Sequence, residues 1–190
     1  QGTALLVIDM QNDFLLPGSP LWTPAGLAIL PNVTRLINIC REKRIPVIYT
    51  THVHEDPQLD GGLTAEWWPE LKRGEALVSG SKGGEIHRDL KPRKGDRVVI
   101  KHRYSAFYNT DLETVLRCLK VEDLIVTGVM TNICCESTAR DAFFRDFRVF
   151  FLADATAALT EELHLGSLRA LAYAFAWITS TEELLRRFGP

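Results

Sequence analysis

The feature that most constrains this fold is a repeated switch between two hydrophobic patterns. Short runs rich in Val, Ile, Leu and Phe alternate with longer segments whose apolar residues recur at helical spacing. The short runs are almost continuously apolar, which is typical of strands covered on both faces in a parallel sheet. The predicted strands span 4–9, 46–51, 96–101, 123–128, 148–154 and 176–180, and the predicted helices span 32–44, 110–120, 134–146, 161–175 and 181–187.

This alternation predicts an α/β fold, a three-layer α/β/α sandwich. Right-handed crossovers place helices on both faces of a central parallel sheet of about six strands, a Rossmann-like arrangement. Thr110-x-x-Glu113 and Ser180-x-x-Glu183 have capping-box spacing, which supports two of the helix starts.

The chain shows no internal division. A length of 190 residues fits one domain, and no repeat, low-complexity tract or linker interrupts it, so we expect a single domain over 1–190. The stretch 52–95 is rich in Gly, Pro, Trp and charge, and we expect it to be a long irregular loop with a functional role.

Composition argues against several classes of partner. The net charge of −2 predicts no attraction to nucleic acid or to an anionic membrane. No apolar run approaches the roughly 20 residues of a membrane span, and we expect no signal peptide because a core strand begins almost at once. The cysteines lack CxxC spacing, so we expect a reduced, cytoplasmic protein in which Cys40 and Cys118 are small core residues.

Three reactive residues fall where an open α/β sheet binds its ligands, beyond the carboxyl ends of the strands. Asp9 ends the first predicted strand, Lys101 ends the third, and Cys134 begins the helix after the fourth. Taken singly, each also fits a solvated charge or a packed thiol. Taken together, they predict a base, a cation and a nucleophile facing one crevice.

These residue types suit acyl transfer to a thiol followed by hydrolysis. A helix start and a nearby ammonium both favour the thiolate of Cys134. The pKa of a free cysteine thiol is about 8.5. The Asp9 carboxylate can accept the thiol proton and deliver it to a leaving amine, while amides at the helix start stabilise an oxyanion. If the protein is such an enzyme, we expect iodoacetamide to alkylate Cys134 much faster than the other cysteines.

Three ordered blocks resemble the isochorismatase-like cysteine hydrolases. They are "VIDMQNDF" (7–14), "KHRYSAF" (101–107) and "GVMTNICCESTARDA" (128–142), and the resemblance runs over essentially the whole chain. That superfamily includes nicotinamidases, N-carbamoylsarcosine amidases and ureidoacrylate amidohydrolases. The resemblance implies an Asp-Lys-Cys triad of Asp9, Lys101 and Cys134, acting through a thioester-type acyl-enzyme.

The resemblance also implies details around the nucleophile. The Val129–Met130 peptide is expected to be cis, and the amides of Met130 and Cys134 are expected to form the oxyanion hole. Cys135 falls where relatives commonly carry Val, so we expect it to pack as a small apolar residue. The family usually assembles into dimers or larger, so we expect a homo-oligomer, a dimer or tetramer.

A metal is a less favoured possibility. Many nicotinamidases of the family bind a divalent ion through an Asp-x-His pair, and this chain has His52 in place of that Asp and keeps His54. With Asp56 nearby, these residues are candidate ligands, since neutral imidazole suits Zn or Fe. We favour a polar loop that contacts substrate or a neighbouring subunit and expect no required cofactor. His87 is equally explained by a structural role.

The expected substrate is a small planar amide, ureide or carbamoyl compound, cleaved with water. The wording "TNICCEST" is closest to the ureidoacrylate and related hydrolases, and the presence of Cys134 favours amide hydrolysis over vinyl-ether cleavage, which needs no thiol. A metal-assisted nicotinamidase and a catalytically inactive α/β binding module remain alternatives. Candidate substrate contacts are Asn12, Ser105 and Asn132 through hydrogen bonds, and Phe14, Trp68, Tyr104 and Phe107 as an apolar wall or as core packing.

Overall fold

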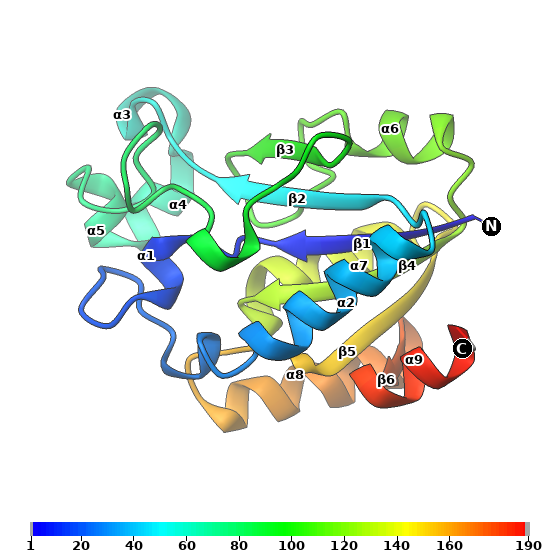
Figure 1. The fold of residues 1–190 in the computed structure, drawn as a ribbon. Coiled ribbons are helices and arrows are strands. Elements are labelled where there is room, and N and C mark those ends of the chain that lie inside the picture. The colour runs from blue at the N-terminus through cyan, green and yellow to red at the C-terminus, as the bar shows by residue number, and fades with distance from the viewer. Residues whose placement is uncertain (1, 189–190) are drawn as a thin grey trace.

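The computed structural model describes residues 2–188 and contains one six-stranded parallel sheet (Figure 1). Its order is β3-β2-β1-β4-β5-β6. The chain builds outward from β1 to β3 and then crosses back to place β4 beside β1, so the direction of winding reverses between these two strands. The strands are β1 (Thr3–Ile8), β2 (Val47–His52), β3 (Arg97–Lys101), β4 (Asp123–Val129), β5 (Arg148–Ala157) and β6 (Trp177–Thr179).

Helices cover both faces of this sheet, which confirms the predicted three layers. Alternate residues of β1 point to opposite faces: Leu5 and Val7 pack into one core cluster, and Leu6 and Ile8 into the other. The first cluster is covered by α2 (Leu30–Glu42) and α9 (Thr181–Phe188). The second is covered by α6 (Leu112–Cys118), α7 (Glu136–Phe143) and α8 (Glu161–Ala174).

The stretch 52–95 is more ordered than predicted. It contains the short helices α3 (Pro57–Asp60), α4 (Gly62–Trp67) and α5 (Pro69–Lys72) and a 3-10 turn, η2 (Arg88–Leu90). Similar short pieces, α1 (Asn12–Leu15) and η1 (Pro24–Gly26), follow β1. Proline stands in the first turn of α3 and of α5, where its missing N–H costs no hydrogen bond.

Two sequence predictions need correction. Cys40 is fully buried as expected, but Cys118 is exposed because it ends α6 on the face away from the sheet. The Ser180–Glu183 capping box forms, with both of its reciprocal bonds at 3.2 Å. At Thr110 the capping box does not form: the hydroxyl accepts from the Leu112 amide at 3.2 Å rather than from that of Glu113, and the Glu113 carboxylate pairs with arginines.

Gly128 lets β1 and β4 approach at the switch point. It pairs with Ile8, has φ of +116°, and a Cβ there would lie 2.0 Å from the Ile8 carbonyl oxygen. Only glycine fits such a close approach with this backbone conformation. Among residues 2–188, no helix combines the length and the apolar character that a membrane span needs.

Candidate active site

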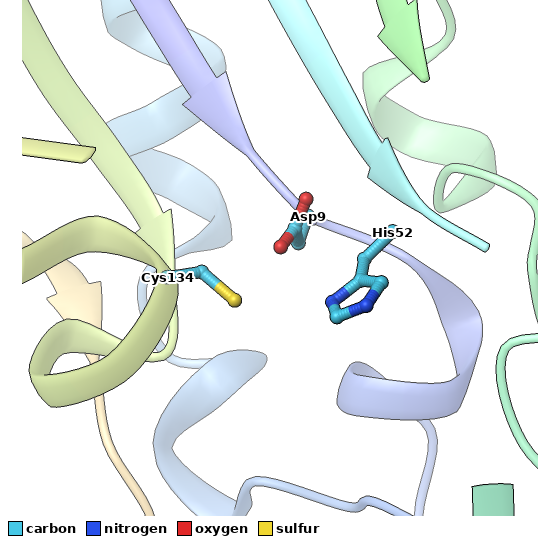
Figure 2. A group of neighbouring side chains, drawn as sticks. All are labelled: Asp9, His52 and Cys134. Atoms are coloured by element: carbon cyan, nitrogen blue, oxygen red, sulfur yellow. The ribbon is translucent and has the colours of Figure 1, made fainter. Parts of the chain in front are cut away.

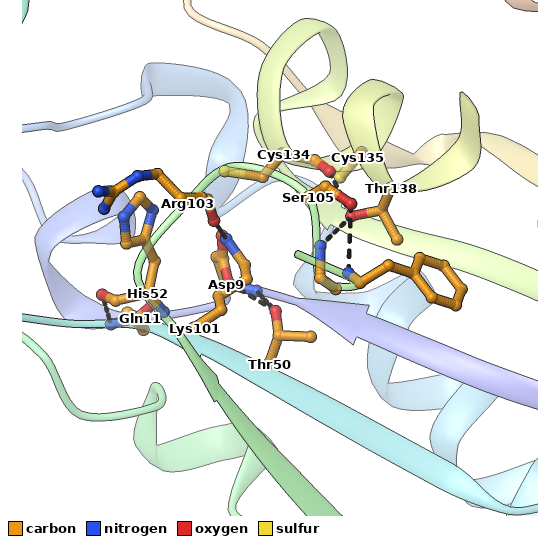
Figure 3. A network of polar contacts seen from close by, with 12 residues as sticks. Asp9, Gln11, Thr50, His52, Lys101, Arg103, Ser105, Cys134, Cys135 and Thr138 are labelled. Carbon is orange, nitrogen blue, oxygen red and sulfur yellow. Dashed lines mark hydrogen bonds and ion pairs between the residues drawn. The ribbon is translucent and has the colours of Figure 1, made fainter. Parts of the chain in front are cut away.

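A fully buried ion pair lies at the carboxyl ends of β1 and β3. Lys101 Nζ lies 2.6 Å from Asp9 Oδ2, and neither side chain is exposed. Thr50 Oγ1 donates to Asp9 Oδ1 at 2.5 Å, and Lys101 Nζ also donates to the Arg103 carbonyl at 3.0 Å. Figure 3 shows this network. Because β2 separates β1 from β3, Lys101 reaches across it to Asp9, as the prediction of a shared crevice requires.

The ion pair lies in a site that excludes water. Burial lowers the pKa of Lys101, but Asp9 and Cys134 together outweigh this effect, and the net pKa of the ammonium is raised. Lys101 is therefore a cation at neutral pH. Asp9 itself adopts a positive φ of 49°, which turns its carboxyl group away from the strand and toward the crevice.

The Cys134 thiol completes the cluster. It lies in a π-helical turn, η3 (Thr131–Cys135), between β4 and α7, and is 2% exposed. Its Sγ, a carboxylate oxygen of Asp9 and a ring nitrogen of His52 all lie within 4.8 Å of one another (Figure 2). Thr138 Oγ1 donates to the Cys134 carbonyl at 2.7 Å and accepts from the Ala106 amide at 3.0 Å, which ties this turn to the loop after β3.

The predicted thiolate is not the resting form. Burial strongly raises the pKa of Cys134, the Lys101 ammonium lowers it, and the neighbouring Asp9 carboxylate raises it again. The expected lowering of this pKa is not borne out, because the cost of burying an anion is larger than the effect of the Lys101 ammonium. The thiol proton therefore needs an acceptor, and Asp9 is within reach.

Two expectations drawn from the resemblance, the cis peptide and the packing of Cys135, are confirmed around the nucleophile. The Val129–Met130 peptide is cis. The Met130 carbonyl accepts from the amides of Ile133 and Cys135 at 3.1 and 3.2 Å, on either side of Cys134. Cys135 is fully buried in the core beneath α7, so it packs as a small apolar residue, as predicted.

A small apolar cavity opens beside the thiol. Its volume of about 20 Å³ holds roughly one water molecule. Trp68 Nε1 donates to the Tyr104 hydroxyl at 3.0 Å, and both side chains line the cavity, so they have to move before an amide can enter. The lining consists of Phe14, Leu21, His52, Thr64, Trp68, Leu71, Leu77, Tyr104, Met130, Ile133 and Cys134.

Three residues of the predicted substrate wall lie at this cavity. Phe14, Trp68 and Tyr104 line the cavity. Asn132 lines an adjoining cleft together with Trp68 and Tyr104, and its buried Oδ1 has no hydrogen-bond partner among residues 2–188. These four side chains are therefore near the thiol, while their contact with substrate stays a prediction.

The other three predicted contacts lie elsewhere. Phe107 is 6% exposed and packs against Phe147 in the core beneath the sheet. Ser105 Oγ accepts from the Phe107 amide at 3.2 Å, and Asn12 Nδ2 donates to the Lys82 carbonyl at 2.7 Å. None of these three side chains is among the residues that line the cavity.

His52, predicted to lie in a polar loop that contacts substrate or a neighbouring subunit, or less favourably to bind a metal, lines the cavity. It ends β2, so the rule that selected Asp9 and Lys101 also selects it. Burial lowers the pKa of His52, and the Lys101 ammonium lowers it further, so the ring is neutral.

Comparison with known proteins decides the family. The model of the isochorismatase domain matches residues 3–183. The chain belongs to the isochorismatase family. It is 43% identical over 185 residues to nicotinamidase 3 of Arabidopsis thaliana, covering 96% of this chain and 87% of that protein. It is 32% identical over 206 residues to a ureidoacrylate amidohydrolase of Caulobacter segnis, covering 98% and 86%.

A solved structure of an isochorismatase-like relative has the same fold. The cysteine hydrolase from Pseudomonas syringae pv. phaseolicola superposes with a TM-score of 0.93 at 34% identity, covering 98% of this chain and 92% of that one. The similar enzymes are hydrolases that act on amides and other C–N bonds. The chain is therefore an isochorismatase-like hydrolase.

The two histidines considered as metal ligands contact each other. His52 Nε2 lies 3.2 Å from His54 Nε2, and His54 Nδ1 lies 2.8 Å from Asp60 Oδ1. The predicted ligand Asp56 is not in this cluster, because it caps α3 by accepting from the Gln58 amide at 2.9 Å. The carboxylate that contacts the histidines is therefore that of Asp60, not that of the predicted Asp56.

These residues do not fit a catalytic metal ion. A catalytic zinc takes three protein ligands. Asp9, His52 and Cys134 bring three such atoms within 4.8 Å of one another, but the Asp9 carboxylate is already paired with Lys101 Nζ at 2.6 Å and His52 Nε2 with His54. Asp60 and His102 come within 4.8 Å of a His54 donor, but Asp60 contacts Nδ1, on the side of the ring opposite His52. An ion held there would be separated from Cys134 by the His54 ring.

Proposed function

We propose that this isochorismatase-like hydrolase is a cysteine-dependent amidohydrolase for a small amide, ureide or carbamoyl compound. The observation that carries the proposal is the buried cluster of Asp9, Lys101 and Cys134 beside an apolar cavity. A nucleophile needs a base within reach and a third group that orients the base. Asp9 is that base, and Lys101 and Thr50 hold its carboxylate in place.

The reaction follows from these positions. The thiol proton of Cys134 passes to Asp9 as Sγ attacks the substrate carbonyl carbon, and the amides of Met130 and Cys134 bind the oxyanion. The C–N bond then breaks, the proton on Asp9 moves to the leaving nitrogen, and a thioester remains. Water attacks the thioester, again giving its proton to Asp9, and the acid product leaves with the thiol restored.

Lys101 pairs with Asp9 before the reaction and offsets the negative charge that develops at Sγ. In a site that excludes water this interaction is stronger than in solvent. The proposal therefore needs the ammonium, not merely a long side chain, at position 101.

Ammonia release tests the proposal directly. The screen covers nicotinamide, ureides, carbamoyl amino acids and simple amides, with the wild type, Cys134→Ala and the matched control Cys135→Ala. We expect loss of release in Cys134→Ala alone, and a thioester adduct on Cys134 in the acid-quenched protein by mass spectrometry. Release that survives in Cys134→Ala, or an adduct on another cysteine, would contradict the nucleophile.

Nicotinamide is the substrate to test first within that screen. Similarity to nicotinamidase 3 of Arabidopsis thaliana and an apolar, partly aromatic cavity both favour a neutral aromatic amide. If anionic substrates are turned over faster than nicotinamide, the result would favour the ureide-hydrolysing branch of the family instead. No release from any compound would support a binding module without activity.

We also propose a homo-oligomer, a dimer or tetramer, of a single cytoplasmic domain. Phe143 and Phe144 at the end of α7 are 46% and 68% exposed, and Tyr173 on α8 is 92% exposed. Such aromatics are enriched at protein interfaces. Light scattering coupled to size-exclusion chromatography tests this, and a monomer at micromolar concentration would contradict it.

A further inference from the structure

Asp60 sets the protonation of His54. Its Oδ2 accepts from the Glu55 amide at 2.9 Å, and its Oδ1 lies 2.8 Å from His54 Nδ1. Burial raises the pKa of Asp60, but these hydrogen bonds outweigh it, and the net pKa is lowered. A carboxylate only accepts hydrogen bonds, so Nδ1 of His54 carries a proton.

His54 in turn sets the protonation of His52. Burial lowers the pKa of His54, and its bond with Asp60 offsets this only in part, so the ring is neutral with a bare Nε2. His52 Nε2 faces that lone pair at 3.2 Å. Two lone pairs would repel, so Nε2 of His52 carries the proton and donates it. In a neutral imidazole the other nitrogen is then an acceptor.

The bare nitrogen of His52 faces the reacting groups. Figure 2 shows the His52 ring turned with one nitrogen toward Asp9 and Cys134. Since Nε2 of His52 contacts His54, this nitrogen is Nδ1. The His52 side chain lines the cavity beside the thiol. It is an uncharged acceptor in a cavity whose other lining is mostly apolar.

We propose that the hydrogen-bonded chain Asp60–His54–His52 replaces a metal ion in this protein and presents His52 Nδ1 as the acceptor for the N–H of the substrate amide. The hydrogen bond orients the scissile C–N bond beside Cys134 and favours substrates with an unsubstituted amide nitrogen. The substrate half of this inference rests on the proposed function. The proton arrangement does not.

The proton arrangement is tested without turnover. Two-bond ¹⁵N–¹H correlation spectra of the ¹⁵N-histidine-labelled protein, assigned with single His variants, distinguish the two neutral tautomers. We expect Nε2–H for His52 and Nδ1–H for His54. In Asp60→Asn one acceptor oxygen becomes a donor, so we expect both tautomers to reverse, whereas the control Asp56→Asn leaves them unchanged. A His52 Nδ1–H tautomer in the wild type, or one tightly bound metal ion per chain by mass spectrometry, would overturn the inference.

The substrate contact is tested by comparing an amide with its ester. The methyl ester of the same acid reaches the same thioester but has no N–H to donate. For His52→Phe we expect kcat/KM on the amide to fall about tenfold or more, because one hydrogen bond to a buried acceptor is lost. We expect the fold loss of kcat/KM on the ester to be at least about five times smaller than that on the amide. Equal losses on both substrates would refute the contact. No turnover by the wild type would instead defeat the proposed function and leave the tautomer result to stand alone.

Discussion

Replacing Lys101 by Met tests the physical basis of the site. Methionine keeps most of the stem but removes the ammonium, which leaves the Asp9 carboxylate in a fully buried position 2.6 Å from where its partner stood. Breaking a buried pair by removing one partner costs about 3–5 kcal/mol, because the remaining charge has neither water nor a counter-ion. We therefore expect the free energy of unfolding to fall by about 3–5 kcal/mol at pH 7.

The double variant separates a buried charge from a loss of packing. Asp9→Asn alone removes the carboxylate that pairs with the Lys101 ammonium and leaves the hydrogen bond to the Arg103 carbonyl, so it too destabilises. In Asp9→Asn/Lys101→Met both charges are gone, and Asn can still bond Thr50. We expect the double variant to be more stable than the sum of the two single losses implies, with a coupling energy of about 2 kcal/mol or more. All three variants should lose amide hydrolysis, because the reaction needs the Asp9 carboxylate and the Lys101 ammonium even where the fold is stable without them.

Urea denaturation followed by fluorescence of the four tryptophans measures these values. The control is Arg35→Met, because Arg35 pairs with Glu182 at 3.0 Å with both side chains more than half exposed. Such pairs contribute about 0–1 kcal/mol. Strictly additive losses at positions 9 and 101, or a Lys101→Met loss no larger than that of the control, would refute the argument.

Further expectations concern the sheet and the thiols. Gly128→Ala places a Cβ 2.0 Å from the Ile8 carbonyl oxygen at a φ of +116°, so β1 and β4 must separate, and we expect a loss of several kcal/mol or failure to fold. Gly166→Ala on α8 meets no atom within 4 Å, and we expect a gain of about 0.5–1 kcal/mol, both read from thermal or urea unfolding. A Gly128→Ala protein as stable as the wild type would contradict the strand contact. Burial reverses the alkylation order expected from the sequence: in the substrate-free protein at pH 7 the exposed Cys118 should react with iodoacetamide before Cys134, as peptide mass mapping will show. Because the pKa of Cys134 is raised, its thiolate fraction and its alkylation rate should increase as the pH rises above 7, and a rate that is flat from pH 7 to about 10 would contradict the raised pKa.

Much of the fold could be predicted from the sequence because strand and helix patterns are local. The six predicted strands all form, with boundaries shifted by a few residues, and the Ser180–Glu183 cap forms as its spacing predicts. The helices α3 to α5 within 52–95 were missed, because short helices have too few turns to show a periodic apolar stripe.

The candidate site was predictable as far as strand ends determine it. Asp9, Lys101 and Cys134 were selected because carboxyl ends of parallel strands meet at one edge of a sheet. Phe107 was misplaced, since an aromatic residue beside a motif fits core packing and a substrate wall equally well. Asp56 was chosen over Asp60 because sequence distance from the histidines does not reveal which carboxylate turns back toward them.

The sequence by itself determined the three-layer class, the family blocks and the identity of the reactive groups, since these depend on local periodicity and on residue type. Only the tertiary structure decided how those groups behave. The order β3-β2-β1 brings Lys101 to Asp9, burial makes Cys134 a thiol rather than a thiolate, and the turn of α3 brings Asp60 to His54. Each of these depends on the exclusion of water and on contacts between segments distant in the chain, and no local pattern records either.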